Sequence, residues 1–314
     1  MTVPPWRIVF FGTPSFALPT LQGLFDGPDD VVGVVTQPDR AKGRGRKIVI
    51  SPVKERALQK GCPLLQPEKV KEEAFQEAVK DLHPDLFVVV AYGQILPKSL
   101  LNIPKYGAVN VHASLLPRYR GAAPIAWAIL NGEKRTGVTT MAMDEGMDTG
   151  GILSQAEVAI GDKETCETLH DRLAPLGAQL LLETLRKMKA GDIRPIPQDH
   201  SKATDAPSLK KEDGRIDWKK EAEEIDRKVR AFNPWPGAYT EWDDRLLKVC
   251  RGEIRKRTPS GRPGVTVWVG SNFIEVETGK DSYLIEEVQL EGRKKMNVRE
   301  FLLGHPIPVG TVFH

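Results

Sequence analysis

Three side chains with complementary chemistry stand in two short stretches of the chain. Asn110 and His112 are two residues apart and belong to an apolar run that starts at Ala108. Side chains alternate between the two faces of a strand, so we expect both to project to the same side. Asp148 follows in the glycine-rich stretch Met143–Gly151. An amide, an imidazole and a carboxylate can together stabilise a tetrahedral oxyanion and accept one proton, so these residues predict a catalytic site.

Each of the three residues also has an ordinary structural explanation. Asn110 could cap a turn, His112 could be a hydrogen-bonded core histidine, and Asp148 could be a simple turn residue. Taken singly, each residue favours that explanation. Taken together, with glycines around them, they favour catalysis.

A strongly basic stretch lies nearer the N-terminus. Between Gln37 and Lys47 the chain carries five cations, one acid and two glycines, with no apolar anchor until Ile48. An isolated charge run is usually a solvated surface loop. Arginines that alternate with small residues also suit bidentate capture of phosphates, so we favour a loop, mobile when free, that binds a polyanionic substrate. Its cations are Arg40, Lys42, Arg44, Arg46 and Lys47.

The first half of the chain alternates strand-like and helix-like segments. Arg7–Phe11, Val31–Val35 and Asp85–Tyr92 are apolar runs typical of buried parallel strands, and Glu68–Leu82 predicts a helix. The pattern predicts an α/β fold with a doubly wound, mostly parallel sheet, a variant of the Rossmann arrangement. A single glycine follows the first strand where Gly-x-Gly-x-x-Gly would stand, which argues against NAD binding.

The second half has a different pattern. Since the chain has 314 residues, we expect two domains, and the stretch 191–214, rich in proline and polar side chains, predicts a linker between domains 1–190 and 215–314. Trp218–Phe232 predicts a helix. Short alternating runs then predict a small OB-like β-barrel, a fold that often binds nucleic acid. These runs are Ala238–Trp242, Leu246–Cys250, Val265–Val269, Phe273–Val276 and Tyr283–Val288.

Composition narrows the class of protein. An apolar fraction of 40% and a charged fraction of 28% are typical of soluble globular proteins. No apolar run approaches the ~20 residues that cross a bilayer, and the N-terminus lacks the apolar core of a signal peptide. The three scattered cysteines argue against a disulfide framework and a zinc site. We therefore expect a cytoplasmic protein without a metal, and the net charge of +3 says little about its partners.

Two motifs around the candidate catalytic residues resemble a known family. Asn110–Gly121 reads Asn-Val-His-Ala-Ser-Leu-Leu-Pro-Arg-Tyr-Arg-Gly, and Asp144–Ile152 reads Asp-Glu-Gly-Met-Asp-Thr-Gly-Gly-Ile. Both are similar to the formyltransferases that use 10-formyltetrahydrofolate. Phe11–Ala17 and Gln37–Gly45 resemble the members of that family that formylate methionyl-tRNA, and the resemblance runs nearly end to end.

The resemblance implies transfer of a formyl group from 10-formyltetrahydrofolate to the α-amine of methionyl initiator tRNA, for translation initiation. Asn110 and His112 would donate hydrogen bonds to the oxyanion, and Asp148 would accept the amine's proton or orient His112. The basic stretch and the C-terminal domain would bind tRNA, and we expect a monomer. The pterin would lie in an apolar slot formed by Phe87, Val90, Tyr92, Leu96, Ser114, Leu115, Leu116 and Pro117.

Three other functions share parts of this pattern. Water could replace the amine, which would make the chain a formyltetrahydrofolate hydrolase, or the acceptor could be a small nucleotide-linked amine. The basic stretch and the predicted barrel argue against both, because a small acceptor needs neither. A non-catalytic RNA-binding protein on the same frame is disfavoured by the intact set of Asn110, His112 and Asp148.

Overall fold

The chain forms two compact units in a computed structural model that describes residues 4–42 and 47–314. The first unit consists of Met1–Pro124, Arg135–Ala159 and His170–Pro207. The second consists of Ile125–Lys134, Ile160–Leu169 and Ser208–His314. Each unit has its own sheet and its own hydrophobic core, so each is described by itself.

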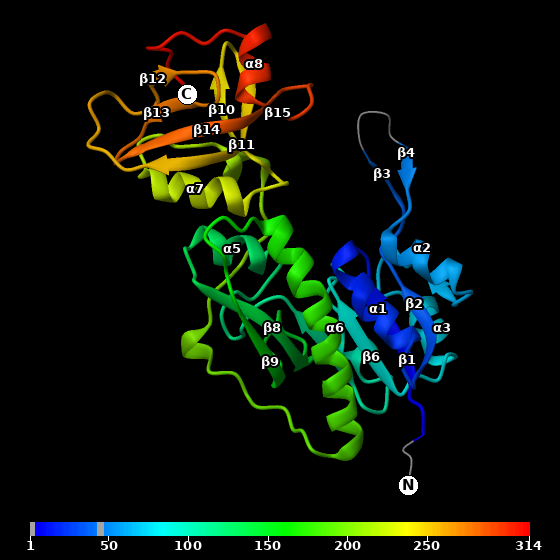
Figure 1. The fold of residues 1–314 in the computed structure, drawn as a ribbon. Helices are drawn as coiled ribbons and strands as arrows, with labels where there is room; N and C mark the ends of the chain where they lie inside the picture. Colours follow the sequence, from blue (N-terminus) through cyan, green and yellow to red (C-terminus); the bar gives the residue numbers. More distant parts are fainter. Residues whose placement is uncertain (1–3, 43–46) are drawn as a thin grey trace. The chain divides into compact units, whose positions relative to one another are not determined.

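The first unit is built on a seven-stranded sheet, shown in blue to green in Figure 1. The strand order is β5-β2-β1-β6-β7-β8-β9. The first five strands run parallel, and β8 pairs antiparallel with both β7 and β9, so β8 alone runs in the opposite direction. The predicted doubly wound, mostly parallel sheet is therefore confirmed. The strands are β1 (Arg7–Gly12), β2 (Asp30–Val35), β5 (Leu64–Leu65), β6 (Leu86–Val90), β7 (Ala108–His112), β8 (Arg135–Ala142) and β9 (Ile152–Ala159).

Helices cover both faces of this sheet. On one face, Phe75 and Val79 of α3 share a buried cluster with Phe87 of β6. On the other, α6 approaches β7 closely, since a Cβ added at Gly177 would lie 2.9 Å from Val111 Cγ1. The helices of this half of the chain are α1 (Leu18–Phe25), α2 (Pro52–Gln59), α3 (Glu73–Lys80), α4 (Lys98–Leu101), α5 (Pro124–Leu130) and α6 (Cys166–Ala190), with 3₁₀ turns at Ser15–Ala17 and His200–Lys202.

The helix predicted over Glu68–Leu82 is shorter than expected. It spans only Glu73–Lys80, and its buried residues are Phe75 and Val79. The N–H of Val70 donates to the Oε1 atom of Gln94 at 3.2 Å, a side chain distant in sequence. This tertiary bond draws residues 68–72 out of the helical path.

The segment expected as a linker makes specific bonds within the first unit. Ile196 and Ile152 exchange two backbone hydrogen bonds of 2.8 Å. The N–H of Arg120 donates to the carbonyl of Thr204 at 2.8 Å, and the N–H of Ala206 donates to the carbonyl of Arg120 at 2.6 Å. The stretch up to Pro207 therefore belongs to the first unit, and the stretch from Ser208 to the second.

The second unit contains an antiparallel sheet with the strand order β10-β11-β14-β13-β12. Each of the five predicted runs corresponds to one of these strands. Trp218, predicted to be helical, instead precedes the helix and donates its indole N–H to Thr240 Oγ1 at 3.0 Å. The elements are α7 (Ala222–Ala231), β10 (Ala238–Trp242), β11 (Arg245–Arg255), β12 (Thr266–Val269), β13 (Ile274–Glu277), β14 (Ser282–Leu290), β15 (Met296–Asn297) and α8 (Val298–Gly304), with a 3₁₀ turn at Lys211–Gly214.

Residues 311–314 close this sheet into a barrel. On one side, the N–H of Thr266 donates to Thr311 O and the N–H of Phe313 donates to Gly264 O, both at 2.8 Å. On the other, Glu241 and His314 exchange backbone hydrogen bonds of 2.8 and 3.1 Å. The segment therefore lies between the edges of β12 and β10. The predicted small barrel is confirmed, with buried Tyr283 and Phe301 in its core.

Among the helices of residues 4–42 and 47–314, none combines the length and apolarity that crossing a bilayer requires.

Candidate active site

Asn110 and His112 lie on β7, inside the sheet. β7 pairs with β6 on one side and β8 on the other, and Asn110 stands opposite Val89 and Met141. Because Val111 faces α6, the side chains of Asn110 and His112 point to the opposite face of the sheet. Both are buried, with 9% and 6% of their surface exposed. The strand therefore holds an amide and an imidazole side by side.

Asp148 brings its carboxylate to both of these side chains. Its Oδ1 accepts a hydrogen bond from Asn110 Nδ2 at 3.2 Å. Its Oδ2 lies 3.5 Å from His112 Nδ1 and accepts from the backbone N–H of Gly121 at 2.8 Å. Asp148 thus contacts both of the other residues singled out in the sequence.

The second ring nitrogen of His112 fixes its protonation pattern. His112 Nε2 lies 2.8 Å from the carbonyl oxygen of Tyr119. A carbonyl only accepts hydrogen bonds, so Nε2 must carry a proton. The Nδ1 atom then faces Asp148 with either a lone pair or, in the imidazolium, a second proton. Both nitrogens therefore face acceptor oxygens.

Two donors remain for a developing oxyanion. Asn110 uses one amide N–H on Asp148 and has a second N–H to donate. At 3.5 Å, the contact between His112 Nδ1 and Asp148 is longer than an ordinary hydrogen bond, so it is mainly electrostatic. An Nδ1–H can therefore be donated to another acceptor nearby while Nε2 keeps its bond to Tyr119 O.

The loop that carries Asp148 is shaped by its own side chains. Asp144 Oδ1 accepts from the N–H of Gly146 at 3.0 Å and from Thr149 Oγ1 at 2.6 Å, which closes a tight turn. Asp148 has φ +54°, in the left-handed region that few non-glycine residues adopt. At Gly150 a Cβ would lie 1.8 Å from the carbonyl oxygen of Ala142, so only glycine fits there. Backbone strain of this kind is typical of functional sites.

The Ser114–Pro117 loop is held by one buried hydroxyl. Thr139 Oγ1 donates to the carbonyl of Ser114 at 2.7 Å and accepts from the N–H of Leu116 at 3.1 Å. Gln155 Nε2 donates to the same hydroxyl and to Leu116 O, both at 2.9 Å. Thr139 of β8 and Gln155 of β9 therefore hold this loop against the sheet.

Most of the side chains expected to contact folate are packed in the core. Phe87, Tyr92 and Leu96 belong to the buried cluster that also contains Phe11. Burial raises the pKa of the Tyr92 hydroxyl, which has no hydrogen-bond partner within the described part of the chain. Val90, Ser114 and Leu116 are buried as well, while Leu115 and Pro117 are half-buried.

Two exposed apolar side chains stand beside these residues in the sequence instead. Ile95 follows β6 and Met147 precedes Asp148, with 59% and 58% of their surfaces exposed. Their loops meet, because Lys98 Nζ lies 3.1 Å from Glu145 Oε1. The chain thus offers apolar surface at this site through Ile95, which the sequence already suggested for the apolar slot, and through Met147, which it did not.

The basic stretch begins in a two-stranded hairpin of β3 (Arg40–Lys42) and β4 (Lys47–Val49). Arg40 is exposed, and Lys42 pairs with Lys47 through the backbone. Arg44 and Arg46 lie outside the described residues.

The one acid of this stretch is already engaged. Asp39 Oδ2 lies 2.5 Å from Lys54 Nζ, and Gln66 Nε2 donates to Asp39 Oδ1 at 3.2 Å. These bonds, the one from Lys54 foremost, lower the pKa of Asp39. Asp39 therefore anchors the base of the hairpin rather than neutralising its cations.

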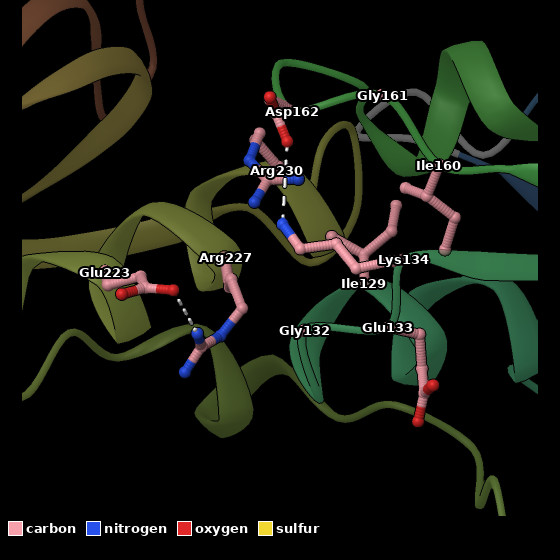
Figure 2. Close-up of a pocket in the computed structure, with 10 residues that line it drawn as sticks. All are labelled: Ile129, Gly132, Glu133, Lys134, Ile160, Gly161, Asp162, Glu223, Arg227 and Arg230. Atoms are coloured by element: carbon pink, nitrogen blue, oxygen red, sulfur yellow. Dashed lines mark hydrogen bonds and ion pairs between the residues drawn. The ribbon is translucent and has the colours of Figure 1, made fainter.

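A cavity in the second unit contains three further cations, shown in Figure 2. Arg227 Nη1 lies 3.2 Å from Glu223 Oε1, and Lys134 Nζ lies 3.5 Å from Asp162 Oδ1. Arg230, the third cation, pairs with Asp226 at 2.7 Å. Since each cation already has an acidic partner, the cavity is a poor site for a phosphate.

Sequence reasoning missed one residue that contacts the Asp148 loop. Gln198 Nε2 donates to the carbonyls of Asp148 at 2.8 Å and Gly150 at 2.7 Å. It stands in a proline-rich stretch without periodicity, where one glutamine gives no signal. Among the described residues, no group of three or more His, Cys, Asp or Glu side chains is arranged to hold a metal ion.

Comparison with known proteins places this geometry in a family. Residues 6–185 match the model of the formyl transferase family, and residues 208–306 match that of the formyl transferase C-terminal domain. A methionyl-tRNA formyltransferase of Caldanaerobacter subterraneus is 51% identical over 307 residues, which are 98% of this chain and 99% of that protein. Another, of Citrifermentans bemidjiense, is 52% identical over 97% of this chain and 95% of that protein.

Solved structures share the fold at lower identity. An N-formyltransferase from Helicobacter canadensis, solved with folinic acid and dTDP-3-aminofucose, matches with a TM-score of 0.68 and 18% identity over 93% of this chain and 100% of that one. Glycinamide ribonucleotide transformylase 1 from Symbiobacterium toebii matches with a TM-score of 0.51 and 23% identity over 61% of this chain and 94% of that one. From the matched segments and the relatives that span its length, it follows that the chain belongs to the formyl transferase family.

Proposed function

We propose that the chain transfers the formyl group of 10-formyltetrahydrofolate to the α-amine of methionyl initiator tRNA. The observation that carries this proposal is the convergence of Asn110, His112 and Asp148 at the end of β7. The identity of the formyl acceptor is supported by relatives named methionyl-tRNA formyltransferase, which are about half identical over nearly the whole chain. The reaction serves translation initiation, so we expect the protein in the cytoplasm. We also expect it to be a monomer.

The chemistry needs one oxyanion site and one proton acceptor. The free amine attacks the formyl carbon and forms a tetrahedral intermediate, and the carbonyl oxygen becomes an oxyanion. The second N–H of Asn110 and the Nδ1–H of His112 stabilise that oxygen. Asp148 accepts the proton that the amine loses, directly or through water. Collapse breaks the bond from the formyl carbon to N10, and N10 takes up a proton as tetrahydrofolate leaves.

The two halves of the chain divide the work in this proposal. The catalytic domain, 1–190, holds folate and the reacting amine, and the barrel domain, 215–314, binds tRNA together with the basic stretch. Expressed alone, residues 1–207, which end where the first unit ends, should bind tetrahydrofolate and formylate tRNA poorly. A fragment as active on tRNA as the full chain would contradict this division.

One assay separates the proposal from its alternatives. The full chain is mixed with 10-formyltetrahydrofolate and, in parallel, with methionyl-tRNA, with aminohexose nucleotides or with buffer alone. We expect N-formylmethionyl-tRNA in the first mixture and little turnover in the others. Free formate from buffer alone, at a rate equal to transfer, would identify a hydrolase. Faster formylation of the sugar nucleotide would identify the small-acceptor enzyme.

A further inference from the structure

Gln198 reaches into the candidate active site from the segment after α6. It is buried, with 6% of its surface exposed. Its side-chain nitrogen donates to the carbonyls of Asp148 and Gly150, at 2.8 and 2.7 Å, so both of its N–H groups have acceptors. Resting on the function proposed above, we propose that Gln198 is a positioning residue that holds the backbone of Asp148 and thereby aims its carboxylate.

Asp148 needs such support because its backbone is strained. A φ of +54° places it in the left-handed region, which few non-glycine residues adopt. The turn made by Asp144 fixes the loop before Asp148, and the close approach of Gly150 to Ala142 fixes the loop after it. Gln198 joins the carbonyls on either side of Thr149, so it pins the stretch between these anchors.

Arg120 sets the direction of the Gln198 amide. Arg120 Nε and Nη2 donate to Gln198 Oε1 at 3.1 and 2.6 Å. A guanidinium only donates hydrogen bonds, so it selects the amide orientation in which the oxygen faces Arg120 and the nitrogen faces the loop. The reversed amide would place its N–H groups against Arg120 and its oxygen against two carbonyls. Arg120 itself is held by backbone bonds to Thr204 and Ala206.

The two residues next to Arg120 in the chain contact the other members of the candidate active site. Tyr119 O accepts from His112 Nε2, and the N–H of Gly121 donates to Asp148 Oδ2. Residues 119–121 therefore contact His112, Gln198 and Asp148 in turn. A shift of this segment or of Gln198 would move the carboxylate relative to the imidazole, so the aim of Asp148 depends on Gln198.

The test replaces the Gln198 donors and keeps their shape. Gln198→Glu retains acceptors for Arg120 and opposes two carbonyls with a carboxylate. Misplacing a reacting group by about 1 Å can cost up to ~10² in rate, so we expect the single-turnover formylation rate to fall ~10–10²-fold. The KM values for folate and tRNA should stay within about threefold, since Gln198 touches the loop backbone rather than a substrate. Gln76→Glu is the matched control, because the Gln76 amide of α3 also donates to two backbone carbonyls, those of Val70 and Lys71, and it should retain wild-type rates.

A double-mutant comparison shows whether Gln198 acts through Asp148. In an Asp148→Asn background, Gln198→Glu should cost less than about threefold, because residues that act as a unit are non-additive. An equal fold-loss in both backgrounds, or a wild-type rate for Gln198→Glu alone, would overturn the inference. Arg120→Met leaves Gln198 in place and should give a smaller loss that is also non-additive. If Gln198→Glu fails to fold, this variant decides the matter, and a wild-type or additive result for it overturns the inference.

The Asp148→Asn variant also distinguishes failure of the proposed catalytic function from failure of the positioning role of Gln198. Wild-type activity of Asp148→Asn would remove Asp148 from the chemistry, so the proposed catalytic role would fail first. A slow Asp148→Asn variant with wild-type Gln198→Glu and Arg120→Met variants would leave the proposed function intact and refute only the positioning role.

Discussion

The substitution Asp148→Asn tests the site with almost no change in shape. The carboxylate meets a donor on each oxygen: Asn110 Nδ2 at Oδ1 and the backbone N–H of Gly121 at Oδ2, with His112 Nδ1 3.5 Å from Oδ2. An asparagine amide at position 148 must turn its own N–H groups toward one of these sides, where donor faces donor. A flip of the Asn110 amide would relieve the clash at Oδ1, but it would turn the Asn110 donors away from the oxyanion. No arrangement therefore restores the wild-type site.

The expected cost follows from the two roles of the carboxylate. Loss of a positioned proton acceptor typically slows a reaction ~10²–10⁴-fold, which corresponds to about 3–5 kcal/mol of transition-state stabilisation. Loss of a charged acceptor for buried donors should lower the free energy of unfolding by about 1–3 kcal/mol. The rate effect should therefore exceed any effect of unfolding at 25 °C, where a two-domain protein of this size remains folded.

The assay measures formation of N-formylmethionyl-tRNA in a single turnover, with enzyme in excess and both substrates saturating. Asp144→Asn is the control, since it makes the same charge change on the same loop. Asp144 bonds to Gly146 and Thr149 within that loop, so we expect less than a tenfold effect from its loss. A rate for Asp148→Asn within tenfold of wild type would refute the proton-acceptor role. Equal losses in both variants would show that loop structure, and not the Asp148 carboxylate, limits the reaction.

Further outcomes are expected. Asn110→Ala and His112→Ala should each slow turnover ~10²–10³-fold with folate binding retained, and near-normal single-turnover rates would contradict the paired-donor assignment. Thr139→Val, which removes the hydroxyl that ties the Ser114–Pro117 loop, should lower the free energy of unfolding by ~2–4 kcal/mol in urea titrations, whereas Thr139→Ser should cost less. Replacing the five cations of the basic stretch, Arg40, Lys42, Arg44, Arg46 and Lys47, by serine should weaken tRNA binding and flatten its log–log salt dependence by about 0.7–0.9 per lost phosphate contact, with folate binding unchanged. Burial raises the pKa of each thiol, those of Cys62, Cys166 and Cys250, to about 11. Above about pH 9 the unfolded chain therefore releases thiol protons that the folded chain keeps, and the free energy of unfolding should fall as the pH rises toward 11. A variant with serine at all three positions should lose part of this pH dependence in urea titrations.

The strands could be predicted from the sequence because their burial is visible in it. β1 and β6 are continuous apolar runs covered on both faces, and the barrel strands alternate between apolar and polar residues. The first residues of the helices were harder to predict. The helix expected over Glu68–Leu82 begins only at Glu73, because the N–H of Val70 donates to the Gln94 side chain and not to a helical carbonyl. Contacts between residues distant in sequence decide such boundaries, and a local pattern does not contain them.

The candidate site, like the fold, contains residues that the sequence could predict and residues that it could not. Asn110 and His112 share a face because strand geometry requires it, and the glycines around Asp148 indicated a constrained loop. Gln198 joins the loop through tertiary contact alone, so sequence spacing could not reveal it. Apolar side chains suit a core as well as a ligand slot, and for Phe87 and Leu96 the structure shows core packing.

The way residues 311–314 complete the barrel has a consequence for how the protein is made. The hydrogen bonds from this segment to Gly264, Thr266 and Glu241 cannot form until His314 has left the ribosome. Until then, β10 and β12 expose unpaired edges, which other chains can bind. The first unit meets no such delay, because its segments are complete at Pro207. Synthesis therefore exposes the nascent chain to aggregation at the barrel, and a chaperone that covers open strand edges should act late, on the second unit.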